Sequence, residues 1–335
     1  MKKMRLGKTE LIISRTGFGA LPIQRVNFET ARKILRKAYD NKITFFDTAN
    51  MYSDSEEKIG YALADVRDKI IIATKSGAAD KEGVFKHIKQ SLNMLRTDYI
   101  DILQLHYPRT LPDPNDKNSS YQALVDVKAK GIVRHIGITT HKLDDAVTAV
   151  KSGLYETLQF PLSALSSEKE LGLIDLCKTY DVGLIAMKAL CGGLLYNAEL
   201  AFTFLRQYEN VVPIWGIQKE EELDEFLELE SNPSELNNAM LEKLKKERLE
   251  LAGNFCRSCG YCLPCPANID IPQAARMYFL LRRMPSKNFL TAEWKQKMEK
   301  VNDCVNCGEC KSKCPYDLDT PKLLKRMYDD YVSFG

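Results

Sequence analysis

Residues 70–106 read IIIATKSGAADKEGVFKHIKQSLNMLRTDYIDILQLH, and this stretch decides the fold. It begins with an apolar run at 70–75 and ends with another at 100–106, and residues 81–95 between them have the pattern of an amphipathic helix. Both runs are short and apolar on both faces, which is typical of parallel strands that have no wet side. The stretch therefore predicts a strand, a helix and a second strand of one parallel sheet.

The same alternation of strand and helix continues to about residue 230. Six further apolar runs predict strands at 16–20, 43–48, 134–139, 157–161, 183–188 and 211–216. Amphipathic stretches predict helices at 27–40, 54–66, 121–130, 143–151, 168–180, 198–207 and 220–229. This order predicts an α/β fold, a (β/α)₈ TIM barrel, with a doubly wound open sheet as the alternative. Residues 5–13 predict a hairpin at the bottom of the barrel, so functional residues are expected at the top, where the strands end.

Composition and charge narrow the class of protein. Of the 335 residues, 44% are hydrophobic and 28% are charged, which excludes a disordered or low-complexity chain. The 48 Lys and Arg residues nearly balance the 45 Asp and Glu residues, which argues against nucleic acid or a membrane surface as a partner. Because neither a run of ~18 apolar residues nor a signal sequence is evident, we expect a cytoplasmic protein with small-molecule partners.

The cysteines divide the chain into two parts. Ten cysteines are present, but only Cys177 and Cys191 lie in the first 250 residues. The other eight fall between Cys256 and Cys314, which indicates a separate cysteine-rich domain. We therefore predict a barrel domain over residues 1–235 and, over residues 236–335, a linker helix followed by a small cysteine domain. Cys177 is predicted to be a core thiol, and Cys191 fits either the core or the phosphate loop described below.

The spacing of these eight cysteines predicts iron–sulfur clusters. Cys304, Cys307, Cys310 and Cys314 have the C-x₂-C-x₂-C-x₃-C-P spacing of bacterial two-cluster ferredoxins, in which the fourth cysteine serves the other cluster. The first group departs from this pattern, with two residues instead of three before its last cysteine. Zinc in Cys₄ sites is the alternative, and disulfides are disfavoured in a reducing compartment. Two [4Fe–4S] clusters are thus predicted, one held by Cys256, Cys259, Cys262 and Cys314, the other by Cys304, Cys307, Cys310 and Cys265.

Four ionisable residues lie at or just after consecutive strand ends, and we expect them to converge. Asp47, Lys75 and His106 end predicted strands, and Tyr52 follows in the loop after Asp47. A lysine beside a tyrosine favours the phenolate, so we expect Lys75 to lower the pKa of Tyr52 while Asp47 keeps Lys75 charged. Tyr52 would then donate a proton to a carbonyl oxygen that His106 orients.

The local sequences at 46–52, 73–75 and 103–106 resemble the aldo-keto reductase family over roughly residues 3–230. With the cysteine domain, the chain resembles the subgroup that carries a C-terminal ferredoxin-like domain with two [4Fe–4S] clusters. The resemblance implies an NAD(P)-dependent oxidoreductase in which hydride passes between a nicotinamide and a small carbonyl substrate. It also implies that the Asp, Tyr, Lys and His named above form the catalytic tetrad.

The resemblance also implies contacts with the nicotinamide cofactor. Gln159 matches the glutamine that holds the carboxamide, and Thr139 stands where a serine usually helps, but Thr140 replaces the usual asparagine. Met187 stands where a tyrosine commonly stacks on the nicotinamide. Loops after the seventh and eighth barrel strands often bind phosphate, which gives as candidates Lys188, Leu190, Gly192, Gly193, Gly216 and Gln218.

The stretch 218–225 bears on the choice between NADH and NADPH. The resembling family places basic residues there for the 2′-phosphate, whereas this chain reads QKEEELDE. The acids favour NADH, although Lys219 would act the other way. An alternative is that they only stabilise the start of a helix.

Three functions fit these features. The first is an aldo-keto reductase-type oxidoreductase whose clusters relay electrons, with a ferredoxin-like partner. Its difficulty is that a hydride carries two electrons and each cluster usually moves one, so direct transfer needs a splitter such as a flavin, or a substrate that tolerates radicals. No flavin motif is evident in the sequence. The second is an ordinary carbonyl reductase with structural clusters. The third is an electron-transfer module on a catalytically idle barrel. The first is our prediction.

Overall fold

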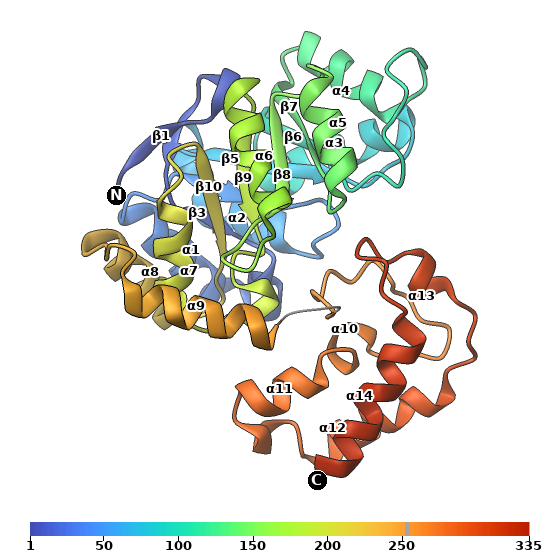
Figure 1. Cartoon of the computed structure of the whole chain (residues 1–335). Helices are drawn as coiled ribbons and strands as arrows, with labels where there is room; N and C mark the ends of the chain where they lie inside the picture. Colours follow the sequence, from blue (N-terminus) through green and yellow to red (C-terminus); the bar gives the residue numbers. More distant parts are fainter. Residues whose placement is uncertain (252–254, 335) are drawn as a thin grey trace. The chain divides into compact units, whose positions relative to one another are not determined.

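The computed structural model describes residues 1–251 and 255–334. They form two compact units (Figure 1). The barrel unit comprises residues 1–189 and 197–241, and the C-terminal unit comprises residues 190–196 and 242–335. The described residues include no helix that is both long and apolar enough to cross a membrane.

The barrel unit contains eight parallel strands that close on themselves, which confirms the predicted TIM barrel. Their order around the barrel is β10-β3-β4-β5-β6-β7-β8-β9. The strands are β3 (Gly17–Gly19), β4 (Phe45–Asp47), β5 (Ile71–Ser76), β6 (Ile100–His106), β7 (Val133–Thr139), β8 (Thr157–Pro161), β9 (Gly183–Met187) and β10 (Val211–Gly216).

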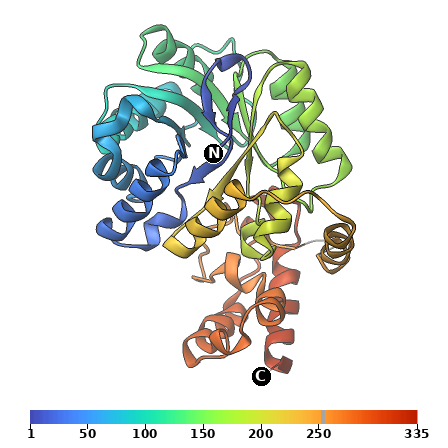
Figure 2. The same cartoon turned by 90° about the vertical axis from the view of Figure 1, so that its left-hand side faces the viewer.

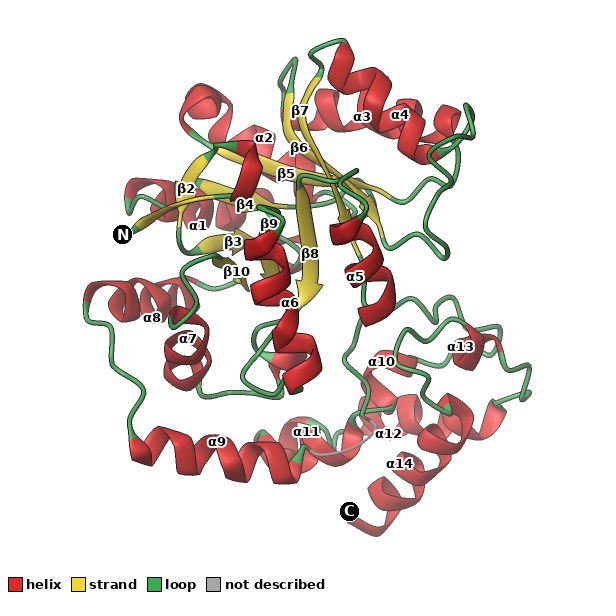
Figure 3. Cartoon of the chain, turned by 45° about the horizontal axis from the view of Figure 1, so that its top comes forward, coloured by secondary structure: helices red, strands yellow, loops and turns green. Residues whose placement is uncertain are grey.

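Helices surround these strands, as Figure 3 shows in red and yellow. Each presents an apolar stripe to the sheet; in the first, Asn27 accepts a hydrogen bond from the Thr30 amide and so caps the helix, while Ile34 and Leu35 are fully buried. The helices are α1 (Phe28–Asp40), α2 (Ser55–Leu63), α3 (Lys81–Leu95), α4 (Ser120–Ala129), α5 (Leu143–Lys151), α6 (Glu168–Thr179), α7 (Ala198–Arg206) and α8 (Glu220–Ser231).

The predicted hairpin is present and meets the chain where β9 begins, which is the bottom of the barrel. It consists of β1 (Lys3–Arg5) paired antiparallel with β2 (Ile12–Ser14), and it lies in front of the strands in Figure 2. The side chain of Leu6 is fully buried against Gly183, where an added Cβ would lie 2.6 Å from the Leu6 Cγ. Because the hairpin closes this end, the functional residues are expected at the other end.

The C-terminal unit is helical. The division between the two units falls within α9 (Asn238–Glu250). The remaining helices of the C-terminal unit are α10 (Ile271–Ala274), α11 (Met277–Arg283), α12 (Ala292–Glu299), α13 (Glu309–Ser312) and α14 (Thr320–Phe334). Residues 271–283 form two helices, α10 and α11, with a break between them. The break falls at Arg276, whose φ of −118° and ψ of 1° are not helical. Its guanidinium donates from Nε to the carbonyl oxygen of Pro272 at 3.1 Å.

Candidate active site and candidate cluster sites

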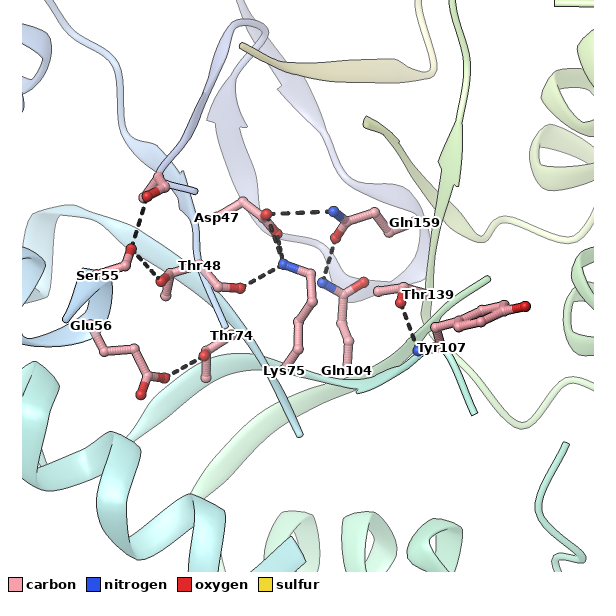
Figure 4. Close-up of polar contacts among 11 residues, drawn as sticks. Asp47, Thr48, Ser55, Glu56, Thr74, Lys75, Gln104, Tyr107, Thr139 and Gln159 are labelled. Atoms are coloured by element: carbon pink, nitrogen blue, oxygen red, sulfur yellow. Dashed lines mark hydrogen bonds and ion pairs between the residues drawn. The ribbon is translucent and has the colours of Figure 1, made fainter. Parts of the chain in front are cut away.

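A buried ion pair lies at the ends of two adjacent strands. The Lys75 Nζ on β5 donates to both carboxylate oxygens of Asp47 on β4, at 2.7 and 2.8 Å, and to the carbonyl oxygen of Thr48 (Figure 4). Asp47 is 3% exposed and Lys75 is 1% exposed. Burial raises the pKa of Asp47 and lowers that of Lys75, and the attraction between the two groups opposes both shifts.

Tyr52 and His106 lie beside this pair, so the structure brings together the four predicted residues. The Lys75 Nζ is 5.5 Å from the centre of the Tyr52 ring, which in turn lies 5.7 Å from the His106 ring at an interplanar angle of 82°. The predicted lowering of the pKa of Tyr52 is wrong: burial raises it, and the negative charge of Asp47 adds to the rise. The difference arises first from the burial of the phenol, which disfavours the phenolate, and then from the negative charge of Asp47.

His106 is held in its neutral form. Burial lowers its pKa to about 3, and the positive charges of Lys75 and Lys188 add to the shift. A neutral imidazole has one N–H donor, which suits a group that hydrogen-bonds a carbonyl oxygen without giving up its proton.

Two amide side chains extend the site into the barrel interior. The Gln159 Nε2 on β8 lies 3.4 Å from the Asp47 Oδ1, and the Gln159 Oε1 accepts from the Gln104 Nε2 on β6 at 2.8 Å (Figure 4). Gln104 is fully buried and was not predicted from the sequence to belong to the site. The available signal was its position two residues before His106, on the same face of the strand.

A second buried carboxyl was also missed. Glu56 on α2 is 1% exposed and accepts a hydrogen bond from the Thr74 hydroxyl, next to Lys75 on β5. Burial raises the pKa of Glu56, and the charge of Lys75 opposes that rise. The available signal in the sequence was an acidic residue four positions after Tyr52, near the start of the helix predicted over 54–66.

The predicted cofactor-binding residues fall in both units. In the barrel unit, Thr139 ends β7, and its hydroxyl accepts from the Tyr107 amide at 3.0 Å (Figure 4). Met187, 9% exposed, ends β9, and Lys188 follows it. The remaining barrel candidates are Gly216, which ends β10, and Gln218. Leu190, Gly192 and Gly193 belong to the C-terminal unit.

The acidic stretch 218–225 has local structural roles. The Glu222 Oε2 accepts from the backbone amides of Gln218 and Lys219, at 2.8 and 3.1 Å, and thereby caps α8. Asp224 forms an ion pair with Lys37 at 2.7 Å. Some of the acids therefore serve the helix whichever dinucleotide is bound.

The eight C-terminal cysteines line two adjoining cavities, here called cage 1 and cage 2. Cage 1 is lined by the predicted first set, Cys256, Cys259, Cys262 and Cys314. Cage 2 is lined by the predicted second set, Cys265, Cys304, Cys307 and Cys310. Cys310 also lines cage 1, and Cys262 also lines cage 2.

Each cage is lined by the four thiols that a [4Fe–4S] cluster requires. Zinc requires four ligands at about 2.0–2.3 Å, whereas a [4Fe–4S] cluster takes four thiolates around a larger body. Burial raises the pKa of Cys262 to about 12, so the thiolate there needs a positively charged group such as iron to be favoured. Cys177 is fully buried, which confirms the predicted core thiol.

Comparison with family models gives two matches. Residues 15–203 match the model described as "Aldo/keto reductase family", and residues 255–319 match "4Fe-4S dicluster domain".

Individual proteins agree with the first match. The chain is 29% identical over 214 residues to the "Uncharacterized oxidoreductase YqkF" of Bacillus subtilis, covering 60% of this chain and 68% of that protein. It is 33% identical over 210 residues to an L-galactose dehydrogenase of Arabidopsis thaliana, covering 57% and 66%. These matches span about two thirds of each relative. The solved aldo-keto reductase AKR11C1 from Bacillus halodurans superposes with a TM-score of 0.65 at 24% identity, covering 74% and 96%, and supports the fold.

The lowered pKa of His106 predicts a pH dependence of stability. The unfolded chain takes up a proton on this histidine as pH falls through about 6.5, whereas the folded chain does so only near 3. Between these values the unfolded state binds more protons, so wild-type stability should fall from pH 7 to pH 5 more steeply than that of His106→Gln. Urea denaturation followed by circular dichroism at several pH values measures this difference. A difference between the two proteins that is the same at pH 7 and pH 5 would contradict the neutral assignment.

Proposed function

The chain belongs to the aldo/keto reductase family and is an NAD(P)-dependent oxidoreductase with a C-terminal 4Fe-4S domain, and from that premise we propose that it transfers hydride between a nicotinamide and a small carbonyl compound. The observation that carries the proposal is the convergence of Asp47, Tyr52, Lys75 and His106 at the strand ends. The relatives include a sugar dehydrogenase, which supports a carbonyl and alcohol pair as the substrate class.

In the proposed mechanism the chain supplies the proton and the orientation. The nicotinamide, when bound, supplies or accepts the hydride. Tyr52 keeps its proton until the carbonyl oxygen gains negative charge, because its pKa is raised in the resting site. Neutral His106 donates a hydrogen bond to that oxygen, and Lys75, held by Asp47, stabilises the phenolate left behind. Gln159 is proposed to hold the carboxamide of the nicotinamide.

Tyr52→Phe tests this proposal. The change removes the proton donor but keeps the ring, so turnover of small aldehydes should fall by about 100-fold or more. Dinucleotide binding, measured by fluorescence titration, should stay within about threefold of wild type, since Tyr52 is assigned to the carbonyl. Tyr61→Phe, on the exposed side of α2, is the matched control and should be fully active. Near-normal turnover by Tyr52→Phe would contradict the assignment of Tyr52 as the proton donor of the catalytic tetrad.

We further propose that NADH binds more tightly than NADPH. Residues 218–225 hold five acids against one lysine, and the 2′-phosphate of NADPH would bring two further negative charges to them. Glu221 is exposed and is not the residue that caps α8, so replacing it should leave the helix intact.

Glu221→Lys should therefore improve the affinity for NADPH relative to NADH by about threefold to tenfold at low salt. Dissociation constants for both dinucleotides measure the effect. Glu235→Lys makes the same change of charge at another exposed position and should leave the ratio unchanged. Equal affinities of the wild type for NADH and NADPH would overturn the preference.

The cages support a second proposed function, the relay of electrons. The two cages adjoin, since Cys262 and Cys310 each line both, and such proximity suits transfer of single electrons between two clusters. One hydride carries two electrons, one for each of two clusters, and its division requires a one-electron intermediary such as a flavin or a substrate that tolerates radicals. A ferredoxin-like protein is the proposed redox partner.

Anaerobic addition of NADH to cluster-loaded protein tests the relay. Bleaching of the visible iron–sulfur absorption, with about two electrons taken up per chain, is the expected result. Dithionite serves as the positive control, because it reduces accessible clusters without the barrel. An unchanged band that dithionite bleaches would instead support a carbonyl reductase with structural clusters.

A further inference from the structure

Residues 190–196 follow β9 directly in the chain but belong to the C-terminal unit. This segment, called loop 190–196, contains the short 3₁₀ turn η4 (Cys191–Gly193). Gly192 and Gly193 have φ values of +69° and +89°, which favour glycine. The loop also carries three of the predicted phosphate-binding residues.

A buried arginine holds this loop. Arg276 is 5% exposed, and its Nη1 donates to the carbonyl oxygen of Gly192 at 2.6 Å. Its Nε donates to the carbonyl oxygen of Pro272, and its Nη2 donates to the Gln273 Oε1. A Cβ on Gly192 would lie 3.3 Å from the Arg276 Nη1, so the glycine allows this close approach.

The same arginine lies beside cage 1. The Pro272 oxygen that accepts from Arg276 is also 4.0 Å from the Cys256 Sγ. Arg276 therefore contacts both the loop and a backbone carbonyl that the side chain of a predicted cluster ligand also contacts.

A second arginine fixes the far end of the loop. The Arg283 Nη1 donates to the carbonyl oxygen of Leu194 at 3.1 Å, and the guanidinium is itself held by Glu247 and Glu250 at 2.6 Å each. By contrast, residues 255–270, which supply three of the four predicted ligands of cage 1, contain neither helix nor strand. Ligation of a cluster would be the main constraint that orders this stretch.

We propose that Arg276 is a positioning residue that ties loop 190–196 to cage 1, so that cluster assembly sets the conformation of the loop and thereby the affinity for the dinucleotide. The step from loop to dinucleotide rests on the proposed function. Arg276 does not touch the reacting atoms in this proposal; it acts through the Gly192 carbonyl.

Hydrogen exchange of the full-length protein tests the tie between cage and loop. The amides of Gly193 and Leu195 both donate to the carbonyl oxygen of Leu190, at 2.8 and 3.1 Å, so their exchange reports on the order of the loop. Exchange should be about tenfold faster, or more, in cluster-free wild type and in cluster-loaded Arg276→Gln than in loaded wild type. Arg276→Lys keeps the positive charge but loses the several N–H donors of the guanidinium. This variant should load iron normally, yet its loop amides should exchange faster than those of loaded wild type.

The control is Arg282→Gln, which breaks an ion pair with Asp330 in the same unit and should leave loop exchange unchanged. Iron content and visible absorption establish loading for each protein. If Arg276→Gln does not take up its clusters, the test uses wild type alone, in its cluster-loaded and cluster-free forms. Equal exchange rates of the loop amides in these two forms would overturn the proposal.

Titration with NADH separates the two proposals. Its dissociation constant should rise by about tenfold in Arg276→Lys. Unchanged affinity together with faster loop exchange would overturn the link from loop to dinucleotide and leave the proposed function standing. Absence of any NADH or NADPH binding by loaded wild type would overturn the proposed function, while the exchange experiment would still test the tie.

Discussion

The buried ion pair between Asp47 and Lys75 is the constraint around which the barrel's site is built. An unpaired charge at this depth would cost several kcal/mol, so each residue requires the other. Parallel pairing of β4 with β5 brings the two strand ends together, since Asp47 is in register with Ala73, two residues before Lys75. The pair also uses most of the hydrogen-bonding capacity of the Lys75 ammonium, which fixes the direction from which it faces Tyr52.

The barrel could be predicted from the alternation of apolar runs and amphipathic stretches, because each run forms a strand and each amphipathic stretch forms a helix in the structure. Stretches 100–106 and 211–216 are strands over the predicted residues, since a run that is apolar on both faces is stable only inside a parallel sheet. The place of Asp47, Lys75 and His106 followed from the rule that strand ends meet at one end of the barrel. The two sets of cysteines were predicted by comparing their spacing with the two-cluster ferredoxin pattern, and each set lines one cage, with Cys262 and Cys310 lining both.

What sequence reasoning missed depends on contacts between residues far apart in the chain. The pKa of Tyr52 rises because the phenol is buried and because Asp47 is negatively charged, and neither cause can be read from a local pattern. Gln104 belongs to the site through Gln159, which is 55 residues away. The helix break at Arg276 goes with hydrogen bonds to Pro272 and Gly192, of which the second spans 84 residues.

The membership of loop 190–196 in the C-terminal unit means that the two units are interleaved along the chain. The backbone passes from the barrel to the C-terminal unit after residue 189, returns at 197 and leaves again after 241. No single cut therefore separates them: a barrel ended near residue 241 would keep the loop and lose Arg276 and Arg283, which hold its carbonyl groups. Two domains joined end to end by gene fusion would not be interleaved in this way. Replacing the C-terminal domain with that of another protein would therefore require the β9–α7 connection, which contains loop 190–196, to be replaced with it.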